Sequence, residues 1–201
     1  MKWIVGGFAL VCLISTASAA ERFSTLTPDQ MTPDQRKVAD QIMKTRKNLS
    51  GPFNAWLRSP ELADRLQNAG EYVRYNTALP KDLTNFAILI AAREWTSQVE
   101  WQIHYPEAVA AGMSPKILAD LAANKRPQGM STDESLIYDF GIGMQRNKGR
   151  VSDKVFEAVR TRFGEKALVD LIGLNGYYDA VAMTINAAQV PLPPGVAPPL
   201  K

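Results

Sequence analysis

Two long apolar segments, residues 83–104 and 167–189, constrain the fold of this chain more than any other feature. A helix on the surface of a protein has one apolar stripe and one polar face, whereas a helix that is apolar on several sides is packed on several sides. Both segments are apolar over more than one helix face. The sequence therefore predicts two central helices with other elements arranged around them.

The other predicted helices are marked by their first residues. Each begins with Ser or Thr followed by Pro or an acidic residue, the pattern of a helix start, and Thr32 and Gln35 have the spacing of a capping box. Period-2 alternation of β-branched residues, the sign of a strand, is not evident. We expect an all-α domain whose outer helices follow these starts, over residues 32–47, 59–75, 114–125, 131–147 and 152–164.

The first 19 residues have the pattern of a secretory signal peptide. Lys2 precedes an apolar run over residues 3–14, and Ala17-Ser18-Ala19 precedes the predicted cleavage site. An uncleaved anchor is the alternative, but the run is short for a span of about 20 residues. The pattern predicts a periplasmic or secreted protein without stable membrane insertion after cleavage. Cys12 is the only cysteine, so we expect no disulfide, thiolate nucleophile or cysteine-bound metal in the mature chain.

The rest of the chain is expected to form one helical domain over residues 20–190 and a Pro-rich tail over residues 191–201. The tail cannot be helical, and we expect it along the surface or on a neighbouring subunit. The two central segments form a possible internal helical repeat, because placing residues 103–104 on 185–186 also aligns 89–90 with 171–172. The net charge is only +3, with cations and anions interspersed, which argues against nucleic acid as a partner.

The segment EWTSQVEWQIH, residues 94–104, contains the only histidine. At about 100° per residue, several of its side chains fall on or beside one helix stripe. They are Glu94, Ser97, Glu100, Trp101 and His104. Glu100 and His104 are one turn apart, so the carboxylate can hold the imidazole in one tautomer. Arg93 lies at the edge of the stripe and could bind an anionic group through its guanidinium.

Three other interpretations of this stripe are a solvated helix face, a metal site and a Ser-His-Asp triad. A solvated helix face with a Glu and a His is common, but these groups lie in a very apolar segment, where unpaired charge is costly. One histidine with nearby glutamates gives at most a partial set of metal ligands, and the sequence contains no HExxH motif. A Ser-His-Asp triad lacks the GxSxG context. We expect no metal and no cofactor.

Three stretches, residues 51–80, 87–115 and 171–195, resemble the carboxymuconolactone decarboxylase family, the all-helical superfamily that also contains the AhpD-like alkylhydroperoxidases. They read GPFNAWLRSPELADRLQNAGEYVRYNTALP, AILIAAREWTSQVEWQIHYPEAVAAGMSP and LIGLNGYYDAVAMTINAAQVPLPPG. The peroxidase branch carries a CxxC before its histidine, where this chain has Ser97 and Glu100. Without a thiolate, a thiol peroxidase cycle is excluded. The resemblance is therefore to the cysteine-free branch.

That resemblance implies a cofactor-independent lyase, decarboxylase-like or isomerase, that acts by proton transfer on a small cyclic or unsaturated carboxylic acid or lactone. His104 would be the general acid or base, and Glu100 would orient it. The residues implied in substrate binding, beside Glu94 and Ser97 of the stripe, are Arg93, Arg74, Tyr72, Tyr75, Trp101 and Tyr178. The family also implies a homo-oligomer, a trimer or hexamer. The alternatives are a non-catalytic exported protein that binds a small aromatic or hydrophobic acid, and a purely structural oligomer of the envelope.

Overall fold

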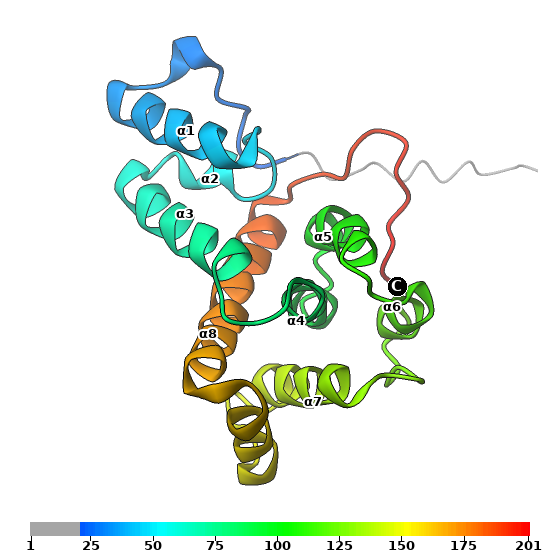
Figure 1. The fold of residues 1–201 in the computed structure, drawn as a ribbon. Helices are drawn as coiled ribbons and strands as arrows, with labels where there is room; N and C mark the ends of the chain where they lie inside the picture. The colour runs from blue at the N-terminus through cyan, green and yellow to red at the C-terminus, as the bar shows by residue number, and fades with distance from the viewer. Residues whose placement is uncertain (1–20) are drawn as a thin grey trace, which may run out of the picture.

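The computed structural model describes residues 21–201, which fold into helices without any strand (Figure 1). The prediction of an all-α protein is confirmed. The predicted signal peptide, residues 1–19, lies outside the described residues. The helices are the short 3-10 helix η1 (Pro28–Gln30), α1 (Pro33–Arg46), α2 (Phe53–Trp56), α3 (Pro60–Tyr75), α4 (Lys81–Glu94), α5 (Gln98–Ala110), α6 (Pro115–Ala122), α7 (Thr132–Arg146) and α8 (Asp153–Ala188).

All five predicted helix starts are N-cap positions in the structure; Thr32, Ser131 and Ser152 cap through their side chains, whereas Ser59 and Ser114 make no side-chain cap hydrogen bond. The Thr32 hydroxyl accepts a hydrogen bond from the Gln35 amide at 3.3 Å, and the Ser131 hydroxyl accepts one from the Glu134 amide at 3.2 Å. Both pairs form complete capping boxes. Each hydroxyl therefore satisfies an amide that has no partner within its helix.

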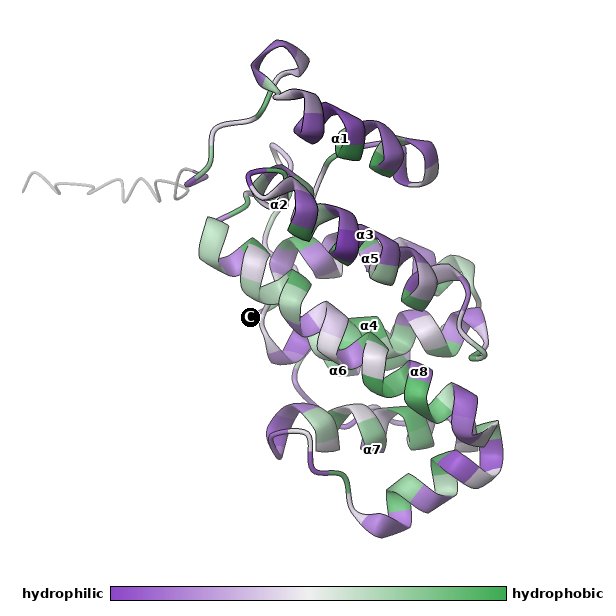
Figure 2. Cartoon of the chain, turned by 90° about the vertical axis from the view of Figure 1, so that its left-hand side faces the viewer, coloured by the Kyte–Doolittle hydropathy of each residue, from purple (hydrophilic) through white to green (hydrophobic). Residues whose placement is uncertain are grey.

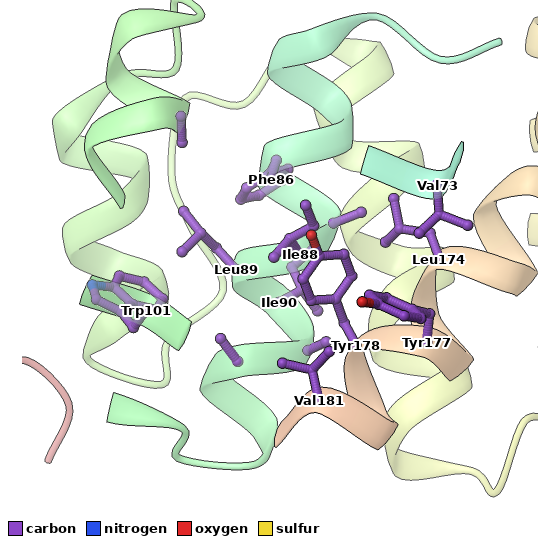
Figure 3. Packing of buried hydrophobic residues seen from close by; sticks show 14 of the residues in the cluster. Val73, Phe86, Ile88, Leu89, Ile90, Trp101, Leu174, Tyr177, Tyr178 and Val181 are labelled. Carbon is purple, nitrogen blue, oxygen red and sulfur yellow. The ribbon is translucent and has the colours of Figure 1, made fainter. Parts of the chain in front are cut away.

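Helix α4 is the centre of the molecule. It packs against α3, α5, α6, α7 and α8, and Figure 1 shows it enclosed by the other helices. Every residue from 86 to 92 has zero exposed surface, and the close view in Figure 3 shows Phe86 and Ile88 inside the core. The hydropathy colouring in Figure 2 places the apolar residues on this inner part of the chain, while α1 is largely polar. The predicted central position of this segment is confirmed.

The expectation that residues 94–104 lie on one helix is wrong. Helix α4 ends at Glu94, and α5 begins at Gln98 after a turn in which Thr96 has a φ of 49°. The Thr96 amide bonds to the Arg93 carbonyl at 3.0 Å and the Ser97 amide to the Ala92 carbonyl at 2.8 Å, which is the Schellman pattern of a helix end. Thr and Ser offer their backbone non-helical alternatives, and the β-branched Thr96 is strained at positive φ.

The second apolar segment forms the last part of α8. Gly164 has a φ of 86° and a non-helical ψ, so it divides α8 into two helical stretches at the point where the sequence changes from mixed to apolar. The stretch after Gly164 contacts α3, α4 and α5 and carries fully buried Leu171 and Leu174. This segment is also central, as predicted. None of the helices in the described range is long and apolar enough to cross a membrane.

The Pro-rich tail, residues 191–201, is extended and returns to its own chain. Leu200 is buried with 3% of its surface exposed. The Gln98 side chain accepts a hydrogen bond from the Leu200 amide at 2.9 Å and donates one to its carbonyl at 2.8 Å. Arg93 Nη2 donates to the Lys201 carbonyl at 2.9 Å. Figure 1 shows the red tail passing over α5 to reach this position.

Candidate active site

A cavity of about 200 Å³ lies between the end of α1, the loop before α2, the end of α3, and helices α5 and α8. Its polar lining includes Arg46, Arg74, Tyr75, Glu100, His104, Glu107, Tyr177 and Tyr178. Two cations, two acids, one imidazole and three phenols therefore face one small space. Such a gathering of ionisable groups in a cavity is typical of a reaction site.

His104 forms part of the cavity wall and has only 4% of its surface exposed. Its Nδ1 atom faces Glu107 Oε2 at 3.5 Å, and its ring packs edge-on against Tyr178 with centroids 5.1 Å apart. Burial lowers the pKa of His104 to about 4, although the Glu107 carboxylate acts in the opposite direction. The imidazole is therefore neutral at pH 7. The nearby Glu107 carboxylate favours the tautomer with the proton on Nδ1, which leaves Nε2 with a free lone pair.

Glu107 and not Glu100 faces the imidazole, which corrects the expected Glu100–His104 pair. Burial alone would raise the pKa of Glu107, but its contacts with His104 and Arg74 outweigh this and lower the pKa. Arg74 forms an ion pair with Glu107. Glu107 is thus a carboxylate that orients His104 and is itself held by Arg74. The i, i+3 spacing of His104 and Glu107 was the only sequence signal for this pair.

Glu100 is the most unusual group of the site. It has 1% of its surface exposed, and neither carboxyl oxygen has a hydrogen-bond partner among the described residues. Burial, and after it the charge of Asp179, raises the pKa of Glu100 well above 4.5, and only the neighbouring Ser97 hydroxyl opposes this shift. An unpaired carboxylate here would be costly, so the surroundings of Glu100 favour its protonated form.

Arg46 is a cavity residue that the sequence analysis missed. Its Nε and Nη2 atoms are buried and have no hydrogen-bond partner within residues 21–201. The guanidinium carbon lies 5.0 Å from the centre of the Phe53 ring and 5.9 Å from that of Tyr75, in cation–π contact. Arg46 is the last residue of α1, whereas His104 lies in α5. The two residues are too far apart in the sequence for a local motif to have indicated Arg46 as a site residue.

Four of the predicted site residues lie elsewhere. The Tyr72 hydroxyl donates to Asp170 Oδ1 at 2.9 Å on the outer side of α3. Arg93 holds the C-terminal tail, as described above. Two further residues are engaged away from the cavity: Glu94 accepts from Arg146 Nε at 2.8 Å, and Trp101 stacks on Tyr105 with centroids 6.3 Å apart. The break between α4 and α5 accounts for Arg93 and Glu94, because these two residues lie at the end of α4 and not on the helix that carries His104.

The remaining predicted residues are at or beside the cavity. Arg74, Tyr75 and Tyr178 line it together with Glu100 and His104. Ser97 is fully buried next to Glu100 without being part of the lining. Tyr177 also lines the cavity and was not predicted; burial raises its pKa to about 12. Over the part of the chain that the structure describes, no cluster of three potential metal-binding residues is present.

No protein-family model matches the sequence, and no curated protein sequence matches it significantly. Among solved structures, the fold is similar to that of the debrominase Bmp8, determined as a cysteine-to-alanine variant in complex with 2,3,4-tribromopyrrole. The TM-score is 0.68 at 12% sequence identity, and the match covers 89% of this chain and 95% of that chain. At this identity the likeness concerns the fold, which is all-helical and consistent with the AhpD-like arrangement.

Proposed function

We propose that this protein is a cofactor-independent lyase or isomerase of the cysteine-free branch of the carboxymuconolactone decarboxylase family, acting on a small cyclic or unsaturated carboxylic acid or lactone. One observation carries the proposal: the buried carboxyl group of Glu100 and the imidazole of His104 border the same cavity as Arg46, whose Nε and Nη2 atoms have no hydrogen-bond partner among the described residues. Burial raises the pKa of the Glu100 carboxyl group and lowers that of the His104 imidazole, which favours Glu100 as a proton donor and His104 as a proton acceptor.

Arg46 is the group that binds the substrate carboxylate. A guanidinium forms two parallel hydrogen bonds with a carboxylate. Arg46 lines the cavity, and its buried Nε and Nη2 atoms have no hydrogen-bond partner within residues 21–201. Arg74 already forms an ion pair with Glu107. The side chains of Phe53 and Tyr75 fix the plane of the Arg46 guanidinium, so a bound carboxylate is oriented relative to His104.

Glu100 and His104 then move the proton. In a decarboxylation, the bond to the departing carboxylate breaks, its electron pair stays on the substrate carbon, and the Glu100 proton is transferred to that carbon. Glu100 regains a proton from water, which is favoured because burial and Asp179 oppose its charged form. In an isomerisation, His104 Nε2 removes a proton from one carbon and Glu100 delivers its proton to another. General acid–base catalysis of this kind contributes about 10²–10⁴-fold.

The experiment measures proton transfer directly. The protein is incubated in D₂O with carboxymuconolactone and with a panel of small unsaturated and aromatic acids, and NMR follows deuterium incorporation and loss of carbon dioxide. We expect Glu100→Gln and His104→Asn to lower the rate about 10²–10⁴-fold while binding persists. Glu61→Gln, whose side chain is 88% exposed in α3, is the matched control. Binding without turnover in the unmodified protein would support the non-catalytic alternative instead.

Export and assembly belong to the same proposal. We propose that residues 1–19 direct the chain to the periplasm or outside the cell and that the mature protein forms a trimer or hexamer. Native mass spectrometry of the exported protein tests these points together, because it reports the cleaved mass, the number of subunits and any small acid that co-purifies. A monomer that retains its first 19 residues would contradict them.

A further inference from the structure

A second cavity of about 320 Å³ lies beside the first. Its apolar lining comes from the loop before α2, from α5 and from the start of the C-terminal tail, and consists of Leu49, Val99, Ile103, Val190, Pro191 and Pro193. The two cavities share Ser50, Gly51 and Ile103 as lining residues. They are therefore neighbours across one thin border.

The border consists of one backbone segment and one side chain. Gly51 has a φ of 70°, and a Cβ atom at this position would lie 3.8 Å from Ile103 Cδ1, so the Ile103 side chain reaches close to the Gly51 backbone. Ile103 directly precedes His104 in α5 and is only partly buried. Ile103 is therefore the large apolar side chain that lines both spaces.

The two cavities differ in polarity. The first contains Arg46 and Arg74, whereas the only charged residue lining the second, within the described chain, is Glu21. The polar lining of the second cavity is partly satisfied, since Asn54 Nδ2 donates to Glu21 Oε1 at 3.0 Å and Asn54 Oδ1 accepts from the Leu26 amide at 3.0 Å. A carboxylate is thus favoured in the first cavity and an apolar group in the second.

The sizes agree with this division. Pockets for small ligands usually have volumes of about 300–1,000 Å³. The first cavity, at about 200 Å³, is below this range and the second, at about 320 Å³, is at its lower end, so the first cavity needs the neighbouring space to hold a ligand of usual size.

We infer that the two cavities form one two-part site for an amphiphilic carboxylic acid: Arg46 binds the carboxylate, the reacting carbons lie at Glu100 and His104, and an apolar chain passes Ile103 into the second cavity. This inference deepens the proposed function and rests on it for the position of the carboxylate. It makes Ile103 and Val99 determinants of substrate length, although neither takes part in the proton transfer.

The test is the binding of straight-chain acids, from butanoic to decanoic acid, measured by isothermal titration calorimetry. Burial of a methylene group contributes about 0.8 kcal/mol, so the affinity of the unmodified protein should rise about fourfold per added methylene until the second cavity is full. Ile103→Trp should bind butanoic acid as before but lose the increase with length. Val99→Phe should end the increase at a shorter acid. Val109→Trp, at an exposed position of α5, is the matched control and should keep the full increase.

Two results would overturn the two-part site. One is an affinity of the unmodified protein that does not change with the length of the acid, and the other is the same dependence of affinity on length in Ile103→Trp and Val109→Trp. If Ile103→Trp fails to fold by circular dichroism, Val99→Phe gives the same decision. The result is separable from the catalytic proposal. A length-dependent affinity without deuterium exchange would keep the two-part site and reject catalysis, whereas exchange on short acids without length dependence would do the reverse.

Discussion

The neutral imidazole of His104 makes a sharp prediction about stability, because it is the only histidine in the chain. Its ordinary pKa of 6.5 in the unfolded chain falls to about 4 in the folded protein, chiefly through burial. Between these values the unfolded state binds a proton that the folded state does not. Stability contributed by the neutral form is therefore complete above pH 6.5 and is lost as the pH falls toward 4.

The magnitude follows from the two pKa values. A gap of about 2.5 pH units, at about 1.36 kcal/mol per unit, limits the total loss to about 3 kcal/mol. Between pH 7 and pH 5 the same linkage gives a loss of about 2 kcal/mol in the free energy of unfolding. The raised pKa of Glu100 has the opposite sign, since its contribution is present at low pH and lost as the pH rises. A variant that lacks only His104 retains the Glu100 contribution. The lowered pKa of Glu107, which His104 helps to set, affects stability mainly below its ordinary value of 4.5, so between pH 7 and pH 5 the difference between the two proteins reports chiefly the histidine.

The assay is urea unfolding of the unmodified protein and of His104→Asn at pH 7 and pH 5. We expect the unmodified protein to lose about 2 kcal/mol more than the variant over this interval. NMR provides an independent measurement, because the sole histidine gives a single Hε1 resonance, and its titration midpoint should be near pH 4. A midpoint near 6.5, or equal losses in the two proteins, would show that the ring is solvated and would remove the basis for a neutral catalytic imidazole.

Two further substitutions test the packing of α3 against α8 and the docking of the C-terminal tail. A methyl group at Gly70 would overlap the Tyr177 hydroxyl, so Gly70→Ala should lower the free energy of unfolding by about 1–3 kcal/mol. The control Gly173→Ala, with nothing within 4 Å of the added carbon, should not lower it. Equal urea midpoints of the two variants would contradict this packing. Leu200→Ala removes the only buried side chain of the tail and should weaken tail docking by about 2 kcal/mol. Hydrogen exchange at the backbone amide of position 200 should therefore accelerate. Unchanged protection of this amide would argue against docking through the Leu200 side chain.

The sequence by itself determined the all-helical class and the starts of α1, α3, α6, α7 and α8. Caps such as those at Thr32 and Ser131 act within three residues, so their chemistry is visible in the local sequence. The long apolar segments likewise identified α4 and the end of α8 as central, because a helix without a polar face must be buried on several sides. The sequence also indicated His104 as the residue to follow, with Arg74 and Tyr178 near it.

The tertiary structure alone decided how these residues are used. The Schellman turn at Thr96 separated Glu94 from His104, and a break of this kind depends on backbone geometry that a helix-period pattern does not contain. Arg46 reaches the site from another helix and Glu107 replaces Glu100 as the partner of the imidazole. Burial and charge are set by neighbours that are remote along the chain, so the pKa values that make Glu100 an acid and His104 a base arise only when five segments close around one cavity.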